Sequence, residues 1–515
     1  MQSAEVSAAG SSTSEQQLDH DAVGVPTLVY FVLSAIAPLS SVIGYLPLVF
    51  AFGDGSGTAG AFLIGAVVWI VFSVGYTRMS LHIRNAGAFS AYISQGLGRT
   101  PGVIASYLAF SAYIILLFAV YGLFGYGMKV FIEPRIHVNL PWWVWAMACA
   151  VVVLGLAYRR IDVGARVVAI LSSAEILLIV IISFAVLFTH RPEGLSAQPF
   201  EPSHVFSGSV GIAMIFAFGV FIGFESTVVY SEEARHPRRT IPIATYVGTA
   251  LIGAVFVLVA YAQTVGWGAG NVVKVITGIF TKGGDPSLLF SGLAKDTLGT
   301  WAVDAVQVLF VTSVFAFLLA FHNITARYMF SLGRSGLLPR PLSVTHRKFR
   351  SPAISSVVQT VVVLVVLAIT AGLGWDPYLQ VSAWFAALGV LAFLVLYAAT
   401  ALAIVAYFVR TRADTSVWAT KVAPLLSGAA IVWAIVLTVQ NFSVYVGAGH
   451  ETAGHVLELL VVATIVVGFG VAQWLRVKRP AVYAEVGMNA EQPEEVVQTT
   501  RPAPVPAFVP VTEEA

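Results

Sequence analysis

Charged residues are scarce in this chain of 515 residues. Aspartate, glutamate, lysine and arginine together make up 10% of the sequence, whereas hydrophobic residue types make up 58%. Soluble domains carry about 25% charged residues, so the composition excludes an ordinary soluble globular protein. The mean hydropathy of +0.85 indicates a chain that lies mostly in a lipid bilayer.

Cysteine is almost absent, since Cys149 is the only one and it lies in an apolar run. It has no internal disulfide partner, and no group of cysteines and histidines has the spacing of a metal site. We therefore expect no metal and no other cofactor. A membrane-embedded enzyme would need a nucleophile with a base or a metal cluster, and the sequence contains no recognisable arrangement of either kind. The net charge of +2 gives no indication of a nucleic-acid partner.

The two ends of the chain differ from its middle. Residues 1–24 are polar at their start and lack the basic beginning and early apolar core of a cleavable signal peptide. Residues 480–515 are rich in proline, valine and glutamate. We interpret both segments as disordered cytoplasmic tails.

Twelve apolar runs lie between these tails, and each is long enough for a membrane helix of about 20 residues. If the N-terminus is cytoplasmic, 22 of the 28 lysines and arginines fall on the cytoplasmic side and 6 on the outer side. This asymmetry follows the positive-inside rule. The sequence therefore predicts an all-α integral membrane protein of the cell membrane with twelve transmembrane helices and both termini cytoplasmic.

A lone carboxyl group lies in the sixth of these runs. No other charged residue occurs between Ser207 and Ser231, and Glu225 closely follows Gly219 and Gly223. A glutamate at the centre of a membrane helix costs about 2.5–3.5 kcal/mol on insertion scales, so it is retained where it faces protein, water or a ligand. Glycine makes a local break in the helix inexpensive. A small-residue packing face is the structural alternative.

The first run contains a second candidate break. Pro38 removes one backbone donor, and Ser40, Ser41 and Gly44 follow about halfway across. A kinked helix with back-bonded serines is the alternative for this run taken alone. The two candidate breaks lie five helices apart, however, and such a pair is typical of an inverted-repeat transporter with a binding site near the middle of the bilayer.

Several motifs resemble those of one transporter superfamily. The segments GFES at 223–226 and EEARHPRRTIPIA at 232–244 resemble the helix 6–7 signature of the APC (amino acid–polyamine–organocation) permeases, with His236 where asparagine is usual. The segments NITAR at 323–327, GRSGLLP at 333–339 and GAFSAY at 87–92 support this resemblance. The resemblance covers about residues 22–478.

The resemblance implies a LeuT-like fold of two inverted repeats of five helices plus two extra helices. The first repeat would span residues 25–189, the second residues 208–409, and the two extra helices residues 422–475. Members of this family move amino acids, amines or related solutes by alternating access, some with a proton and others by exchange. The family's usual Gly-Ser-Gly segment of helix 1 stands here as SSVIG at 40–44, which narrows the space beside the backbone.

These observations give a set of candidate binding residues, carried by the two breaks and by nearby polar and aromatic side chains. The expected substrate-binding residues are Ser40, Ser41, Val42, Gly44, Tyr113, Phe218, Gly219, Phe221, Gly223, Glu225, Phe321, Asn323 and Trp384. Two functional interpretations of Glu225 stay open, a contact to a substrate amine and a protonatable gate. A hydrogen bond between helices is the structural alternative.

Glu175 is the only charged residue across the fifth run. Some proton-coupled members of the family have a lysine here. A carboxyl group shielded from water can carry a proton, and it can also help to bind sodium; a hydrogen bond to a neighbouring helix is the structural alternative. We favour the proton, because the stretch from Ala316 to Phe321 offers no serine or threonine ligands for sodium. We therefore predict proton-coupled uptake of an amino acid or a related amine, with an exchanger, a non-transporting solute sensor and a channel as alternatives.

Overall fold

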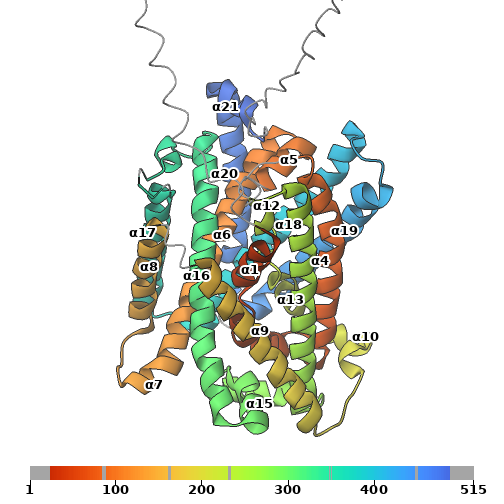
Figure 1. Ribbon diagram of the computed structural model, residues 1–515, viewed down its shortest axis with the longest axis vertical. Coiled ribbons are helices and arrows are strands. Elements are labelled where there is room, and N and C mark those ends of the chain that lie inside the picture. Colours follow the sequence, from red (N-terminus) through yellow and green to blue (C-terminus); the bar gives the residue numbers. More distant parts are fainter. Residues whose placement is uncertain are drawn as a thin grey trace, which may run out of the picture.

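The computed structural model describes residues 24–83, 89–159, 164–229, 234–346, 348–349, 351–446 and 451–487, which fold into a bundle of helices (Figure 1). Within these residues, nine helices are long and apolar enough to cross a bilayer. They are α4 (Thr58–Ser80), α6 (Arg99–Gly127), α9 (Gly164–Thr189), α13 (Pro237–Trp267), α16 (Thr300–Arg334), α17 (Ala353–Gly372), α18 (Ala383–Thr411), α19 (Ala423–Val446) and α20 (Glu451–Lys478).

The outer faces of these helices are strongly apolar. Phe188 of α9 is 71% exposed, Val466 of α20 is 61% exposed, and Leu402 of α18 is 55% exposed. Large exposed apolar surfaces are unfavourable in water and mark contact with another apolar phase. The protein is therefore a multi-pass, all-helical membrane protein.

The first apolar stretch is broken where the sequence predicts it. It forms α1 (Val25–Ile36), α2 (Pro38–Gly44) and α3 (Leu46–Phe52), and Ala37 separates the first two with a left-handed backbone, φ 46° and ψ 74°. At the break, Ser41 Oγ donates to the Ile36 carbonyl at 3.1 Å, and the Ala37 carbonyl accepts hydrogen bonds from the Ser41 amide at 3.1 Å and from Ser40 Oγ at 2.8 Å. The stretch is thus an interrupted helix and not a simple kink.

The second predicted break is also present. Helix α11 (Val210–Gly219) ends in a turn over residues 220–225, and α12 (Ser226–Val229) follows it. Gly223 lies in this turn with φ +120°, a conformation that side chains other than glycine rarely adopt.

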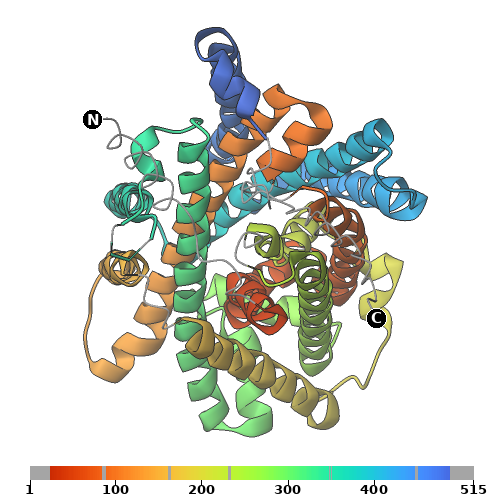
Figure 2. The ribbon, with the colours of Figure 1, turned by 45° about the horizontal axis from the view of Figure 1, so that its top comes forward.

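The broken helices lie inside the bundle. Helix α1 packs against α9, α13 and α16, and Figure 2 shows α1 in red, enclosed by these three helices. Helix α11 contacts α4, α18 and α19. A shorter apolar helix, α8 (Trp142–Tyr158), packs against α17 at one edge of the bundle in both views (Figures 1 and 2).

The expected C-terminal tail begins later than predicted. Residues 480–487 are folded and include the short helix α21 (Pro480–Glu485). The Tyr483 hydroxyl lies 2.7 Å from Thr100 Oγ1, and Gln95 Nε2 donates to the Gly487 carbonyl at 2.8 Å. The expectation of disorder is therefore wrong for this segment, because it packs on α5 (Phe89–Leu97) and the start of α6. Residues 1–23 and 488–515 of the two expected tails lie outside the described residues.

Candidate functional site

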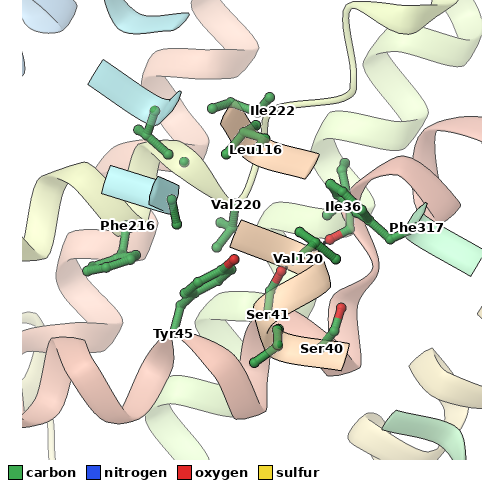
Figure 3. A pocket seen from close by; sticks show the side chains of 14 residues that line it. Ile36, Ser40, Ser41, Tyr45, Leu116, Val120, Phe216, Val220, Ile222 and Phe317 are labelled. Atoms are coloured by element: carbon green, nitrogen blue, oxygen red, sulfur yellow. Dashed lines mark hydrogen bonds between the residues drawn. The ribbon is translucent and has the colours of Figure 1, made fainter. Parts of the chain in front are cut away.

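A small cavity lies where the two helix breaks meet (Figure 3). About 40 Å³ of it is open to the centre of a water molecule. It is lined by Ile36, Ser40, Ser41, Tyr45, Leu116, Val120, Leu123, Phe216, Gly219, Val220, Ile222, Phe317, Ala386 and Val390.

The polar part of the wall comes from the breaks. Figure 3 shows the hydroxyls of Ser41 and Tyr45 directed toward the cavity, and Ser40 contributes a third hydroxyl to its lining. The ring of Tyr45, between α2 and α3, stacks on Phe216 of α11 with centroids 5.5 Å apart, so this contact joins the two interrupted helices. Sequence reasoning missed Tyr45, because nothing in its neighbourhood separates it from an ordinary core tyrosine.

The carboxyl group of Glu225 lies outside this lining and is fully enclosed. The Tyr113 hydroxyl donates to Oε1 at 3.1 Å, and the Tyr397 hydroxyl donates to Oε2 at 2.6 Å. The Gly223 amide donates to Oε2 at 2.7 Å. Helix α6, helix α18 and the turn that follows α11 therefore converge on one carboxyl group.

An aromatic layer surrounds Glu225. Tyr397 packs against Trp69, whose indole Nε1 donates to the Phe218 carbonyl at 3.2 Å, a carbonyl beside the second break. On the other side, the Tyr113 ring packs on Phe321, with centroids 5.4 Å apart. The layer consists of Trp69, Phe72, Tyr76, Phe89, Tyr113, Phe224, Phe321, Phe393 and Tyr397. Its rings fill the space around the carboxyl group.

Glu175 connects three helices beside the first break. It is buried, and its Oε2 accepts a hydrogen bond from Ser313 Oγ of α16 at 2.7 Å. Ser313 Oγ lies 3.4 Å from Ser40 Oγ, which belongs to the cavity wall. The carboxyl group also interacts with the backbone of Leu39 in α2. Hydroxyl groups thus link the cavity to Glu175. The sequence did not single out Ser313, which lies just before the apolar stretch from Ala316 to Phe321.

The structure places the predicted residues in different surroundings. Of the predicted substrate-binding residues, the cavity lining contains Ser40, Ser41 and Gly219. Tyr113, Gly223 and Glu225 come together in the hydrogen-bonded group described above; Phe321 belongs to the aromatic layer, and Phe218 contacts it.

The remaining predicted residues lie elsewhere. Val42 and Gly44 are buried in α2, and Gly44 faces the side chain of Leu123. The ring of Phe221 lies against Trp69, and Trp384 packs on Trp375 with centroids 5.3 Å apart. Asn323 is half-buried on α16. None of these five residues, Val42, Gly44, Phe221, Asn323 and Trp384, belongs to the lining of the described cavity.

Comparison with known proteins gives a consistent result. The family described as amino acid permease matches residues 24–472. The chain is 23% identical over 323 residues to the low-affinity putrescine importer PlaP of Escherichia coli, a match covering 60% of this chain and 66% of that protein. It is 22% identical over 335 residues to the branched-chain amino acid permease BcaP of Bacillus subtilis, covering 59% and 66%. The matches thus span about two thirds of these relatives' length.

A solved structure has the same fold. The manganese transporter of Eremococcus coleocola matches with a TM-score of 0.53 and 13% identity, covering 91% of this chain and 99% of that chain. This likeness supports the LeuT-like fold that the broken helices indicate, and it says nothing about the solute.

Proposed function

Because the chain belongs to the amino acid permease family of the APC superfamily, we propose that it is a secondary active transporter for an amino acid or a related amine. One observation carries this proposal: two interrupted helices, one ending at Ile36 and the other at Gly219, enclose a cavity with a polar wall. Interrupted helices place backbone groups beside a ligand in the middle of a bilayer.

The proposed topology has twelve transmembrane segments with cytoplasmic termini. The nine long helices supply nine of them, and the interrupted stretches 25–52 and 210–229 together with α8 supply the other three. Residues 25–189 and 208–409 would form the two inverted repeats, followed by the two extra helices within 422–475. The excess of lysine and arginine on one side supports this orientation.

In this orientation the aromatic layer lies on the cytoplasmic side of the cavity. Helix α6 runs outward, and Tyr113 precedes Leu116 of the cavity wall; α18 runs inward, and Tyr397 follows Val390. We therefore assign Glu225 to a cytoplasmic gate, closed here by Tyr113 and Tyr397. A direct contact between Glu225 and a substrate amine would require the layer to open first.

Coupling to a proton would run through Glu175. Ser40 and Ser313 connect its carboxyl group to the cavity, and hydroxyl groups both donate and accept hydrogen bonds. Within the described residues no lysine or arginine lies within ion-pair distance of Glu175, so a proton can neutralise the group without breaking an ion pair. We propose that Glu175 gains a proton with substrate uptake and loses it to the cytoplasm.

Uptake into proteoliposomes tests the proposal. Labelled amino acids and amines are supplied outside, with the lumen more alkaline than the medium and with equal pH as the control. We expect uptake of at least one compound that the pH gradient stimulates and that Glu175→Gln no longer couples. Counterflow without net uptake would identify an exchanger instead. Binding seen as a thermal shift, without either activity, would identify a sensor and overturn the transport proposal.

A further inference from the structure

We infer that the cavity between α2 and α11 selects neutral amino acids with an apolar side chain and rejects diamines, dibasic amino acids and acidic amino acids. The inference rests on the proposed transport function and specifies its substrate class. It follows from the division of the wall into a polar part at the breaks and an apolar remainder.

The polar part of the wall is uncharged. It consists of the hydroxyls of Ser40, Ser41 and Tyr45 and the backbone beside Gly219 and Val220, where the helix gives way to a turn. An ammonium and a carboxylate on one carbon atom largely offset each other's charge. Ser40 and Ser41 donate their own hydroxyl protons to the carbonyls of Ala37 and Ile36, so their oxygens can accept from the ammonium, and the Tyr45 hydroxyl is the donor for the carboxylate. The polar wall therefore fits the head group of an α-amino acid without an ion pair from the protein.

The rest of the wall has no partner for a second charge. It includes Leu116, Val120 and Leu123 of α6, Ala386 and Val390 of α18, and Phe317 of α16. Among the described residues that line the cavity, none is aspartate, glutamate, lysine, arginine or histidine. Burying an unpaired charge against such a surface is unfavourable, so an apolar side chain is accepted and a charged one is rejected.

The two nearby acids are already engaged. The carboxyl group of Glu225 accepts three hydrogen bonds, and the residue is 0% exposed and does not line the cavity. Its partner Tyr113 packs on Phe321, which stacks on Phe317 of the cavity wall. Glu175 is 1% exposed and accepts the hydroxyl of Ser313. Both carboxyl groups are enclosed by other side chains, so neither can receive the distal amine of a substrate unless those side chains move.

The relatives PlaP and BcaP are named for solutes of different chemistry. Putrescine carries an amine at each end, whereas branched-chain amino acids carry one head group and an apolar side chain. PlaP is named a putrescine importer, and BcaP is named a branched-chain amino acid permease. The wall of this cavity matches the second kind of molecule.

A substrate panel on the wild-type chain tests the inference. The full-length protein in proteoliposomes is given leucine, valine, putrescine, lysine and aspartate, and kcat/KM is measured for each. We expect leucine or valine to exceed each of the other three at least about 100-fold, since a charged group would lack a partner. Putrescine, lysine or aspartate within tenfold of leucine would overturn the inference alone. No uptake of any of the five would overturn the proposed function together with the inference.

A gain-of-function variant tests whether the cavity itself sets this selectivity. Val390→Asp places a carboxyl group in the apolar wall, and Val390→Asn is the uncharged variant of the same shape. We expect the ratio of lysine to leucine uptake to rise at least tenfold in Val390→Asp and to stay near the wild-type ratio in Val390→Asn. An unchanged ratio in a folded Val390→Asp protein would overturn the inference, and the wild-type panel decides the matter if this variant does not fold.

Discussion

The hydroxyl of Tyr397 donates a 2.6 Å hydrogen bond to the carboxyl group of Glu225, although the two residues lie 172 positions apart in the chain. This bond ties α18 to the turn after α11, and both elements also contribute residues to the cavity wall. Because the proposed transport cycle requires these segments to separate, the bond belongs to one conformation and must be broken in the other.

The first prediction concerns that bond. Tyr397→Phe removes the hydroxyl and leaves Glu225 with the donors of Tyr113 and Gly223. We expect a loss of about 1–3 kcal/mol of stability for the closed arrangement, because a buried acceptor loses a partner. A lower Tm of the detergent-solubilised protein measures this loss. Tyr407→Phe is the matched control, since Tyr407 lies on the same helix and is half-buried. Equal Tm values for the two variants would contradict the role assigned to Tyr397.

The second prediction concerns coupling. Ser313→Ala removes the hydroxyl that links Ser40 to Glu175. We expect stimulation of uptake by a pH gradient to fall about tenfold, the size expected for a lost hydrogen bond to a carboxylate, while counterflow is retained. Thr312→Val removes the neighbouring hydroxyl, which bonds to the backbone of its own helix, and should leave coupling intact. Wild-type stimulation in Ser313→Ala would show that the serine plays no part in coupling.

The third prediction concerns the cavity wall. A Cβ atom at Gly219 would lie 2.7 Å from Cγ2 of Val390, so the side chain of Val390 must shift in Gly219→Ala. Overpacking of this kind costs about 1–3 kcal/mol, and we expect KM for the best substrate to rise about tenfold or more. Gly372→Ala is the control, because a Cβ there meets nothing within 4 Å. The double variant Gly219→Ala/Val390→Ala should recover part of the affinity; if it does not, the steric explanation is wrong.

The fourth prediction concerns pH and stability. Asp54 lies between α3 and the 3₁₀ turn η2 (Gly55–Gly57), and burial raises its pKa to about 8. The folded state therefore holds a proton that the unfolded state, with a pKa of about 3.9, releases. The stability from this proton is complete below about pH 4 and is lost as pH rises toward 8, a loss on the order of a few kcal/mol.

Melting curves of the Asp54→Asn variant test this assignment. Asparagine is neutral at every pH, so Tm of Asp54→Asn should fall less than that of the wild type between pH 5 and pH 8. Asp296→Asn, which alters an exposed carboxyl group on α15 (Leu288–Leu298), should follow the wild type. Parallel curves for the wild type and Asp54→Asn would argue against a proton on Asp54.

The breaks were predictable from sequence because they depend on local backbone chemistry. Pro38 cannot donate a hydrogen bond, and Gly223 adopts a backbone conformation that other residues rarely adopt. The isolated carboxyl groups of Glu225 and Glu175 were predictable for a similar reason, since each is the only charge in an apolar run.

Apart from Tyr113 and Gly223, which were expected in the site, the partners of those groups were not predictable. Tyr397, Trp69 and Ser313 reach the site from distant helices, and the chain contains 18 tyrosines and 11 tryptophans with no local feature that separates these from the others. Position along a helix could not be predicted either: Phe321 was expected to bind the substrate, whereas Phe317, one turn earlier on the same helix, lines the cavity. Such details depend on how helices slide against one another, which periodicity does not determine.

Labelling of an engineered cysteine tests most directly that the two interrupted helices enclose a substrate. Cys149, the only cysteine, is buried and is replaced by serine; Ser41→Cys then places a thiol in the cavity wall, and Thr277→Cys supplies a partly exposed control outside the lining of the cavity. With the best substrate at ten times its Kd, we expect a water-soluble thiol reagent to label Ser41→Cys about tenfold more slowly and Thr277→Cys at an unchanged rate. Labelling of Ser41→Cys at the same rate with and without saturating substrate would contradict the account.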